Sequence, residues 1–230
     1  MKTHTVASLA KSIDHSLLNP VLTDQAMVEG IEIAKKYKVA SVCIKPYFIS
    51  MAAEILKGSG VAVGAVIGFP HGGHTTSIKF LEAQQAIHDG ATELDMVVNI
   101  GKVLSGDWEF VETDLRAVVN ICKARGAVSK IIFENCYLED KHKLKLCEIS
   151  ERIGANYVKT STGYGSGGAT NEDLKLMRAN VGSKVKVKAA GGIRTLDRLV
   201  EVLDLGVSRV GATATVAILD EAAKKFEKPA

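Results

Sequence analysis

Strand-like and helix-like segments alternate along the whole chain, and this alternation restricts the possible folds more than any other feature. Eight short apolar runs rich in Val, Ile and Ala are separated by longer stretches with apolar residues at helical spacing. Eight strand-plus-helix units of about 25–30 residues each are what a closed parallel barrel requires. We therefore expect one α/β domain over residues 1–230, a TIM (β/α)8 barrel. An open, doubly wound sheet uses the same alternation and is the alternative architecture.

The expected elements are placed by periodicity and by helix-end signals. The strand-like runs lie near residues 12–14, 39–44, 61–67, 93–98, 129–133, 156–160, 184–189 and 207–211. Helical patterns cover Thr23–Tyr37, Thr76–His88, Trp108–Lys123, Lys141–Ile153, Asn171–Ala179, Leu196–Asp204 and Thr213–Phe226. Thr170 followed by Asp173 is a typical helix start, because the hydroxyl caps the helix and the acid favours its first turn.

Composition and charge exclude several other classes of protein. Hydrophobic residues make up 47% and charged residues 24% of the chain, which is typical of a globular domain and not of a disordered one. A net charge of +3, evenly spread, gives no reason to expect a nucleic-acid partner. No apolar run is long enough for a membrane span, and Met1–Ala10 has no signal-peptide core. The four cysteines form no C-x-x-C pair, so we expect a reduced, cytoplasmic protein.

Ionisable residues at the expected strand ends are the main functional signal. In a parallel barrel the chemistry lies at the carboxyl ends of the strands. The residues at those ends are Asp14, Cys43, Gly68, Asp95, Glu134, Lys159, Lys188 and Gly211. Five of these eight residues are acidic or basic where an ordinary core would be apolar, so we expect the active site there.

Lys159 and Lys188 end consecutive strands and are candidates for covalent chemistry. Lys159 could form a Schiff base, or its stem could simply pack while its amine reaches water. Two ammonium groups about 4 Å apart, at an effective dielectric near 20, repel by about 4 kcal/mol. Such repulsion lowers one lysine pKa by roughly three units, into the range of a nucleophilic amine. The alternative is that each lysine balances a nearby carboxylate.

Asp95 is a carboxylate in an apolar strand, and it therefore needs a partner or a task. It could transfer protons and also hold Lys188. Because side chains alternate along a strand, Glu93 shares a face with Asp95, and Lys186 shares one with Lys188. We predict that Glu93 and Lys186 pair inside the barrel, one layer deeper.

Glycine-rich turns follow the seventh and eighth strands. They read Gly191-Gly192-Ile193-Arg194-Thr195 and Gly211-Ala212-Thr213. Backbone N–H groups at such helix starts bind anions, and this is the usual phosphate position in barrels. We therefore expect a phosphate site, the alternative being ordinary turns with Arg194 on the surface.

Two further motifs have to be weighed. Gly163–Gly168 matches G-x-G-x-x-G, a dinucleotide-binding pattern, but it comes late in the chain and lacks the acidic residue expected about 20 positions later. We expect an active-site loop there instead. His71 and His74 have a spacing that could suit a metal, but no carboxylate or cysteine lies nearby in sequence, so no metal site is expected.

Taken together, these motifs resemble the 2-deoxyribose-5-phosphate aldolases, which are class I aldolases. The resemblance is carried by Ile13-Asp14-His15-Ser16-Leu17-Leu18, Val42-Cys43-Ile44, Val66–Pro70 with Thr75-Thr76, Glu93–Gly101, Val158–Gly163 and Lys188–Thr195. It implies a TIM barrel that reversibly cleaves 2-deoxy-D-ribose 5-phosphate to acetaldehyde and D-glyceraldehyde 3-phosphate. It also implies no metal or organic cofactor, and assembly as a homodimer or homotetramer.

The resemblance further implies roles for individual residues. Lys159 would form the Schiff base, Lys188 would lower its pKa, and Asp95 would act as acid and base with a water. The substrate-lining residues would be Asp14, Ser16, Leu18, Cys43 and Thr162. The phosphate site would comprise Gly163, Gly191, Gly192, Ile193, Arg194, Gly211 and Thr213. The chain departs from the family pattern at Ser16, Asn135 and Thr215, and its last residues, Phe226–Ala230, lack a terminal tyrosine.

Three other functions remain to be distinguished from the aldolase. A different phosphate-binding barrel, either an isomerase or another Schiff-base aldolase, would share the glycine-rich turns. A nicotinamide-dependent oxidoreductase would use the Gly163–Gly168 loop. A non-catalytic binding protein on the same scaffold is disfavoured, because it has no use for a lysine with a lowered pKa.

Overall fold

A computed structural model describes residues 4–226 and shows eight parallel strands closed into a barrel in the order β1 to β8. The strands are β1 (Ile13–Leu17), β2 (Ser41–Ile44), β3 (Ala62–Ile67), β4 (Glu93–Val97), β5 (Val128–Ile132), β6 (Tyr157–Lys159), β7 (Lys186–Ala190) and β8 (Arg209–Ala212). Pairing of β8 with β1 closes the barrel. The expected TIM barrel is confirmed, and the open doubly wound alternative is wrong. The expectation about the tail after Phe226 lies outside the described residues.

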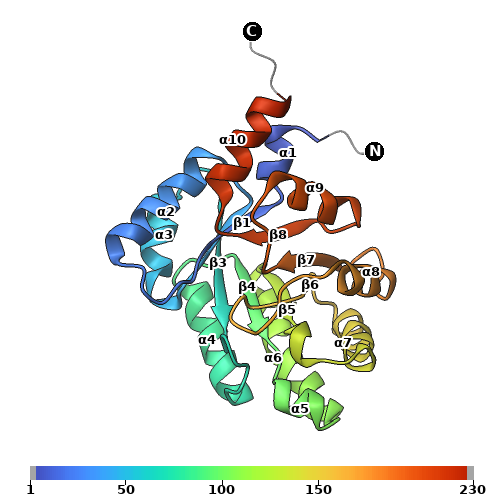
Figure 1. Cartoon of the computed structure of the whole chain (residues 1–230). Helices are drawn as coiled ribbons and strands as arrows, with labels where there is room; N and C mark the ends of the chain where they lie inside the picture. The colour runs from blue at the N-terminus through green and yellow to red at the C-terminus, as the bar shows by residue number, and fades with distance from the viewer. Residues whose placement is uncertain (1–3, 227–230) are drawn as a thin grey trace.

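A ring of helices covers the outside of the barrel (Figure 1). The main helices are α2 (Asp24–Lys36), α3 (Ile49–Ile55), α4 (Thr76–His88), α6 (Trp108–Arg125), α7 (Asp140–Ile153), α8 (Asn171–Ala179), α9 (Leu196–Asp204) and α10 (Thr215–Phe226). Shorter elements are α1 (Val6–Ala10), α5 (Ile100–Leu104) and two 3-10 turns, η1 (Pro46–Phe48) and η2 (Asn135–Tyr137). Within residues 4–226 no helix has both the length and the apolar character needed to cross a membrane.

Periodicity located most helices but missed three short ones, α1, α3 and α5. The bounds of α4, α8 and α9 agree with those expected. Helix α3 was missed because it is only seven residues long and carries no side-chain N-cap. The first strand is also longer than expected and runs on to Leu17, so Asp14 lies near its start and not at its end.

The apolar core lies between the strands and the helices, while the barrel interior is strongly charged. Along β4, Leu94 and Met96 point outward and are fully buried under the helices. The alternate residues Glu93 and Asp95 point into the barrel and are also buried. This alternation places charged groups beneath the carboxyl ends of the strands.

Candidate active site

Asp95 brings the two strand-end lysines together inside the barrel. Its Oδ2 atom accepts hydrogen bonds from Nζ of Lys159 at 2.7 Å and from Nζ of Lys188 at 2.6 Å. The side chains of Asp95, Lys159 and Lys188 are at most 3% exposed. The sequence led us to expect the two lysines close to each other, and they share one carboxylate oxygen.

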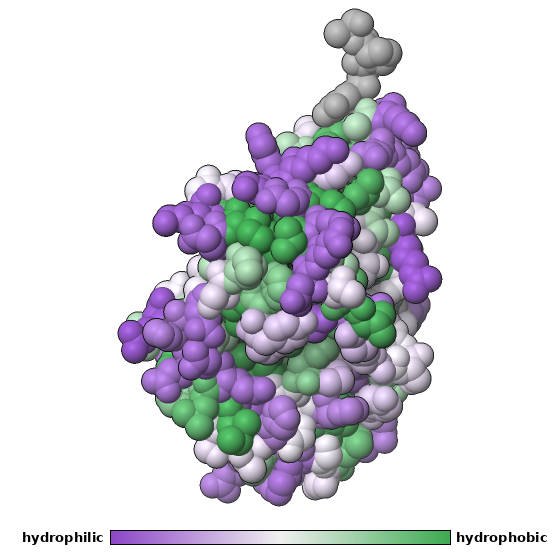
Figure 2. All heavy atoms as spheres, turned by 90° about the vertical axis from the view of Figure 1, so that its left-hand side faces the viewer, coloured by the Kyte–Doolittle hydropathy of each residue, from purple (hydrophilic) through white to green (hydrophobic). Residues whose placement is uncertain are grey.

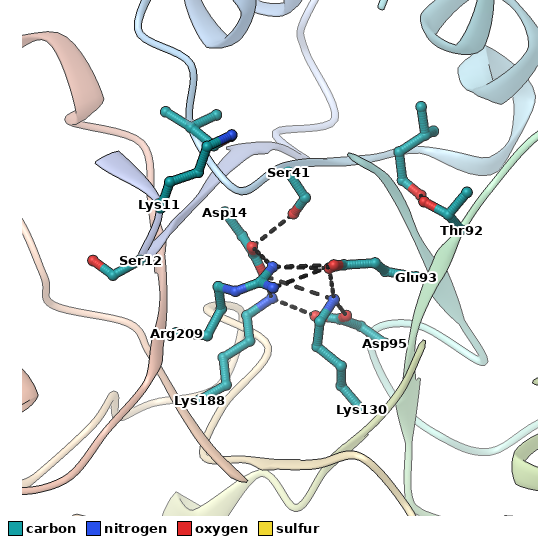
Figure 3. A network of polar contacts seen from close by, with 12 residues as sticks. Lys11, Ser12, Asp14, Ser41, Thr92, Glu93, Asp95, Lys130, Lys188 and Arg209 are labelled. Atoms are coloured by element: carbon teal, nitrogen blue, oxygen red, sulfur yellow. Dashed lines mark hydrogen bonds and ion pairs between the residues drawn. The ribbon is translucent and has the colours of Figure 1, made fainter. Parts of the chain in front are cut away.

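A network of ion pairs lies directly below this carboxylate (Figure 3). Lys130 on β5 contacts Oδ1 of Asp95 at 2.6 Å and Oε2 of Glu93 at 2.7 Å. Arg209 on β8 contacts Oδ1 of Asp14 at 2.6 Å and Oε2 of Glu93 at 3.0 Å. Lys188 also contacts Oδ2 of Asp14 at 2.6 Å. Ionic contacts therefore connect side chains from β1, β4, β5, β7 and β8.

The predicted pair of Glu93 and Lys186 is wrong. Glu93 does point into the barrel, but its cationic partners are Lys130 and Arg209. Lys186 is exposed, and its amine lies 5.8 Å from the centre of the Tyr157 ring. Strands of a closed barrel are tilted and staggered, so residues of equal parity on different strands need not meet at one height. Alternation alone could not identify the partner.

The surroundings of Lys159 lower its pKa. Burial is the largest cause, because it disfavours the charged ammonium, and the positive charge of Lys188 acts in the same direction. The carboxylate of Asp95 opposes both effects but does not overcome them. The direction is the one expected from the sequence, although burial contributes more than the neighbouring lysine.

The pKa values of Lys188 and Asp95 shift so that both groups keep their charge. Burial alone would lower the pKa of Lys188, but Asp14 and Asp95 raise it above its ordinary value. Burial alone would raise the pKa of Asp95, but Lys130, Lys159 and Lys188 hold it well below its usual range. At neutral pH the site therefore contains a carboxylate, an ammonium at Lys188, and an amine at Lys159 that gives up its proton more readily.

A pocket of about 420 Å³ opens above these groups, at the carboxyl ends of the strands. The expected site residues that line it are Ser16, Leu18, Cys43, Lys159, Thr162, Gly163, Lys188, Gly191, Gly192, Ile193, Arg194, Gly211 and Thr213. Asp14 was expected to line the pocket, but it lies beneath the floor and is fully buried, because β1 continues three residues past it. Asp95 is likewise fully buried and reaches the pocket only through the lysines.

The glycine-rich loops after β6 and β7 meet at one side of the pocket. The N–H of Ala169 donates to the carbonyl oxygen of Gly191 at 3.1 Å. A Cβ at Gly191 would come within 2.8 Å of Cα of Gly168, and Gly191 has φ +83°, so a side chain is excluded there. An active-site loop was expected at Gly163–Gly168, and its residues Gly163 and Tyr164 line the pocket.

Two buried polar contacts lie beside the pocket, one at the loop after β6 and one between β1 and α10. Glu134, two residues after β5, accepts hydrogen bonds from the backbone N–H and the hydroxyl of Thr162. His15 Nδ1 lies 2.7 Å from the hydroxyl of Thr215, the first residue of α10. Thr215 is one of the departures from the family pattern, and this contact gives its hydroxyl a partner. Burial lowers the pKa of His15 to about 4, so the ring is neutral at pH 7.

One wall of the pocket region is apolar. Leu18, Cys43 and Val66 form a small buried cluster, against which Phe69 packs. Burial raises the pKa of the Cys43 thiol, so it carries no negative charge at neutral pH. Leu18 and Cys43 line the same pocket as Lys159, and their side chains do not bind water strongly.

The histidines weighed as metal ligands do not form a cluster. His74 Nδ1 lies 3.5 Å from a carboxylate oxygen of Glu82. Among residues 4–226, no group of three or more His, Cys, Asp and Glu side chains is arranged to hold a metal ion.

Sequence reasoning missed several residues of the site. Lys130 and Arg209 were not singled out, although Lys130 interrupts an apolar strand as Asp95 does, and this signal could have identified it. Tyr164, Asn19 and Pro20 line the pocket from loops, where sequence alternation gives no signal, and Ala190 and Ala212 line it from the ends of β7 and β8.

Comparison with known proteins agrees with this geometry. The family model described as DeoC/LacD family aldolase matches residues 8–220. A curated deoxyribose-phosphate aldolase of Rhodopirellula baltica is 54% identical, over 96% of this chain and 92% of its own length. One of Bacillus mycoides is 50% identical, over 94% and 97%.

Solved structures give the same result. The tetrameric deoxyribose phosphate aldolase of Aeropyrum pernix superposes with a TM-score of 0.88 at 31% identity, covering 96% of this chain and 92% of that one. Both the sequence match and the structural match extend over nearly the whole chain. The chain belongs to the DeoC/LacD family of aldolases.

Proposed function

We propose that this protein is a deoxyribose-phosphate aldolase, which reversibly cleaves 2-deoxy-D-ribose 5-phosphate to acetaldehyde and D-glyceraldehyde 3-phosphate. The observation that carries the proposal is the pairing of Lys159 and Lys188 on a single oxygen of Asp95 beneath a pocket. A lysine with a lowered pKa, next to a lysine that keeps its proton, is suited to form and then protonate a Schiff base. The curated relatives named above carry the same activity in their names.

The cleavage follows from the positions of these groups. The neutral amine of Lys159 adds to the aldehyde carbon of the open-chain sugar, and a proton from Lys188 lets the hydroxyl group of the adduct leave as water, which gives a protonated imine. Asp95, acting through a water, removes the proton of the C3 hydroxyl, so the C2–C3 bond breaks and its electrons pass to the imine. D-glyceraldehyde 3-phosphate leaves. The proton taken from the C3 hydroxyl passes through water and Lys188 to C2, and hydrolysis of the protonated imine releases acetaldehyde and the free amine and returns a proton to Lys188.

The imine itself accepts the electrons of the broken bond, so the proposed chemistry requires no metal or organic cofactor. The phosphate would lie against the glycine-rich turns at Gly163, Gly191, Gly192 and Gly211, with Ile193, Arg194 and Thr213 beside it. Ser16, Leu18, Cys43 and Thr162 would contact the sugar chain. Asp14 would contribute from below, through its ion pair with Lys188.

A substrate comparison tests the proposed activity. Purified protein is given 2-deoxyribose 5-phosphate, unphosphorylated 2-deoxyribose, and a ketose phosphate such as fructose 1-phosphate, and acetaldehyde and triose phosphate are measured. We expect cleavage of the deoxy sugar phosphate, weaker cleavage of the unphosphorylated sugar, and none of the ketose phosphate. Preferential cleavage of the ketose phosphate would instead indicate a different Schiff-base aldolase. Tight binding of a nicotinamide dinucleotide would indicate the oxidoreductase.

We further propose that the protein is a cytoplasmic homodimer or homotetramer. Its four cysteines are free, which suits a reducing compartment. The Aeropyrum pernix relative is a tetramer. On the face shown in Figure 2, hydrophobic residues reach the surface. Tyr47 in η1, Met51 in α3 and Leu81 in α4 are each more than half exposed. Light scattering should give a mass of two or four chains, and M51K/L81K should reduce it; a monomeric wild-type protein would contradict the proposal.

A further inference from the structure

The ionic groups below the pocket form a balanced set. The negative members are Asp14, Glu93 and Asp95, and the positive members are Lys130, Lys188 and Arg209. Three negative and three positive charges cancel, so Lys159 is a seventh group whose proton would give the set a net positive charge. All seven side chains are at least 87% buried, because the largest exposed fraction is the 13% of Arg209.

Resting on the proposed function, we propose that Glu93 and Arg209 are positioning residues that complete this neutral set and, acting in opposite directions, set the pH at which the Lys159 amine loses its proton and can attack the aldehyde. Neither residue lines the pocket or contacts Lys159. They act through two chains of contacts. In the first chain, Arg209 forms an ion pair with Asp14, and Asp14 forms one with Lys188. In the second chain, Glu93 forms an ion pair with Lys130. Both Lys188 and Lys130 also contact Asp95, the carboxylate that accepts a hydrogen bond from Lys159.

The pKa shifts of the individual ionic groups agree with this arrangement. Burial alone would lower the pKa of Lys130 and of Arg209, but the neighbouring carboxylates raise both. Burial alone would raise the pKa of Asp14, but Lys188, Lys130 and Arg209 lower it. Among the four cations considered, Lys159 alone has a lowered pKa. The titratable groups that act on it directly are Asp95 on β4, Lys188 on β7 and Cys43 on β2.

Because the charges of the set cancel, substitutions of Glu93 and of Arg209 should shift the pKa of Lys159 in opposite directions. Glu93 lies two positions before Asp95 on β4, about 7 Å along the strand, which puts its charge roughly 10 Å from the Lys159 amine. At that distance and an effective dielectric near 20, one unit charge shifts a pKa by about one unit. Glu93→Gln leaves an uncompensated positive charge and should lower the pKa of Lys159. Arg209→Gln leaves a negative charge and should raise it.

The test follows the reactivity of Lys159 as a function of pH. Acetaldehyde and cyanoborohydride are added between pH 5 and 9, and alkylation of Lys159 is measured by peptide mass spectrometry relative to the exposed Lys186 in the same sample. We expect the midpoint to move down by about one pH unit in Glu93→Gln and up by about one in Arg209→Gln. The charge-compensated double variant E93Q/R209Q should return close to the wild-type midpoint. Glu32→Gln, the same charge change on the exposed face of α2, should leave it unchanged.

A common loss of reactivity with unmoved midpoints would mean that the two residues only support the fold, and would overturn the proposal. Each single variant tests the direction of its own midpoint shift, so the proposal can be tested even if only one variant folds. Lys130→Met is a third variant, and it should shift the midpoint upward. Alkylation by acetaldehyde does not require the natural substrate. Wild-type protein that fails to cleave deoxyribose 5-phosphate while the midpoints shift would therefore refute the proposed function and leave this inference intact.

Discussion

Lys159 and Lys188 donate hydrogen bonds to the same oxygen atom of Asp95, at 2.7 and 2.6 Å. Two ammonium groups bonded to one atom repel each other strongly, and the arrangement is relieved when one of them releases its proton. Lys188 has two carboxylate partners and Lys159 has one. Lys159, which reaches the pocket from the short strand β6, is therefore the lysine that gives up its proton more readily.

Removal of the Lys188 charge should damage catalysis more than folding. In Lys188→Met the proton donor is lost, and we expect kcat to fall by about 10²–10⁴-fold. The pKa of Lys159 should rise, because one nearby positive charge is gone, and the acid limb of kcat/KM should move to higher pH. Lys186→Met is the matched control, since this lysine lies on the same strand but is exposed. Equal losses in both variants would contradict the role of Lys188.

The backbone of the loop after β7 should determine phosphate affinity. Gly191→Ala forces a Cβ to within 2.8 Å of Gly168 at positive φ, so the two loops must separate. Loss of a hydrogen bond to a charged group corresponds to roughly tenfold or more in KM for 2-deoxyribose 5-phosphate. The KM for unphosphorylated 2-deoxyribose should change little. Gly60→Ala, also at positive φ but with no atom within 4 Å of the added Cβ, is the control and should alter neither value.

His15 should make the fold sensitive to acid. Its pKa falls from 6.5 to about 4 on folding, so between these values the unfolded chain binds a proton that the native state does not. Stability should therefore fall as the pH drops below 6.5, by about 2 kcal/mol at pH 4.5. Urea unfolding of the wild type and of His15→Asn, each at pH 7.0 and 4.5, isolates this contribution. An equal loss in both proteins would contradict the assignment.

A second buried ion pair, between α4 and α6, should matter for stability and not for chemistry. Nζ of Lys79 contacts Oδ2 of Asp114 at 2.6 Å and also donates to the carbonyl oxygen of Val97. Lys79→Met leaves a buried carboxylate without its cation, and we expect a loss of about 3–5 kcal/mol in the free energy of unfolding. K79M/D114L removes both charges and should recover much of that loss. A single variant as stable as the wild type would show that the pair contributes nothing.

The sequence predicted the helices and strands of this protein better than the side-chain contacts inside its barrel. The helices Thr76–His88, Asn171–Ala179 and Leu196–Asp204 have the expected bounds, because periodicity and capping are local properties. The ion-pair partner of Glu93 could not be predicted in this way. Whether Lys186 or Lys130 reaches it depends on the tilt and stagger of strands in a closed barrel, which no single strand encodes.

The first strand shows the same limit in another way. Its continuation through His15 and Ser16 depends on pairing with β2 and not on β propensity. Because β1 extends to Leu17, Asp14 lies in the ionic network below the pocket and not in the pocket wall where it was expected. Lys159, Lys188 and Asp95 could be identified from the sequence because a charged group at the end of an apolar strand is unusual wherever it occurs.

Trapping the covalent intermediate tests the central claim most directly. Wild-type protein is incubated with 2-deoxyribose 5-phosphate, reduced with borohydride, digested and examined by mass spectrometry. We expect one modified peptide, which carries the adduct on Lys159, and none in Lys159→Arg, which should also lack cleavage activity. An adduct on Lys188 instead, or full cleavage activity in Lys159→Arg, would contradict the assignment of Lys159 as the Schiff-base lysine.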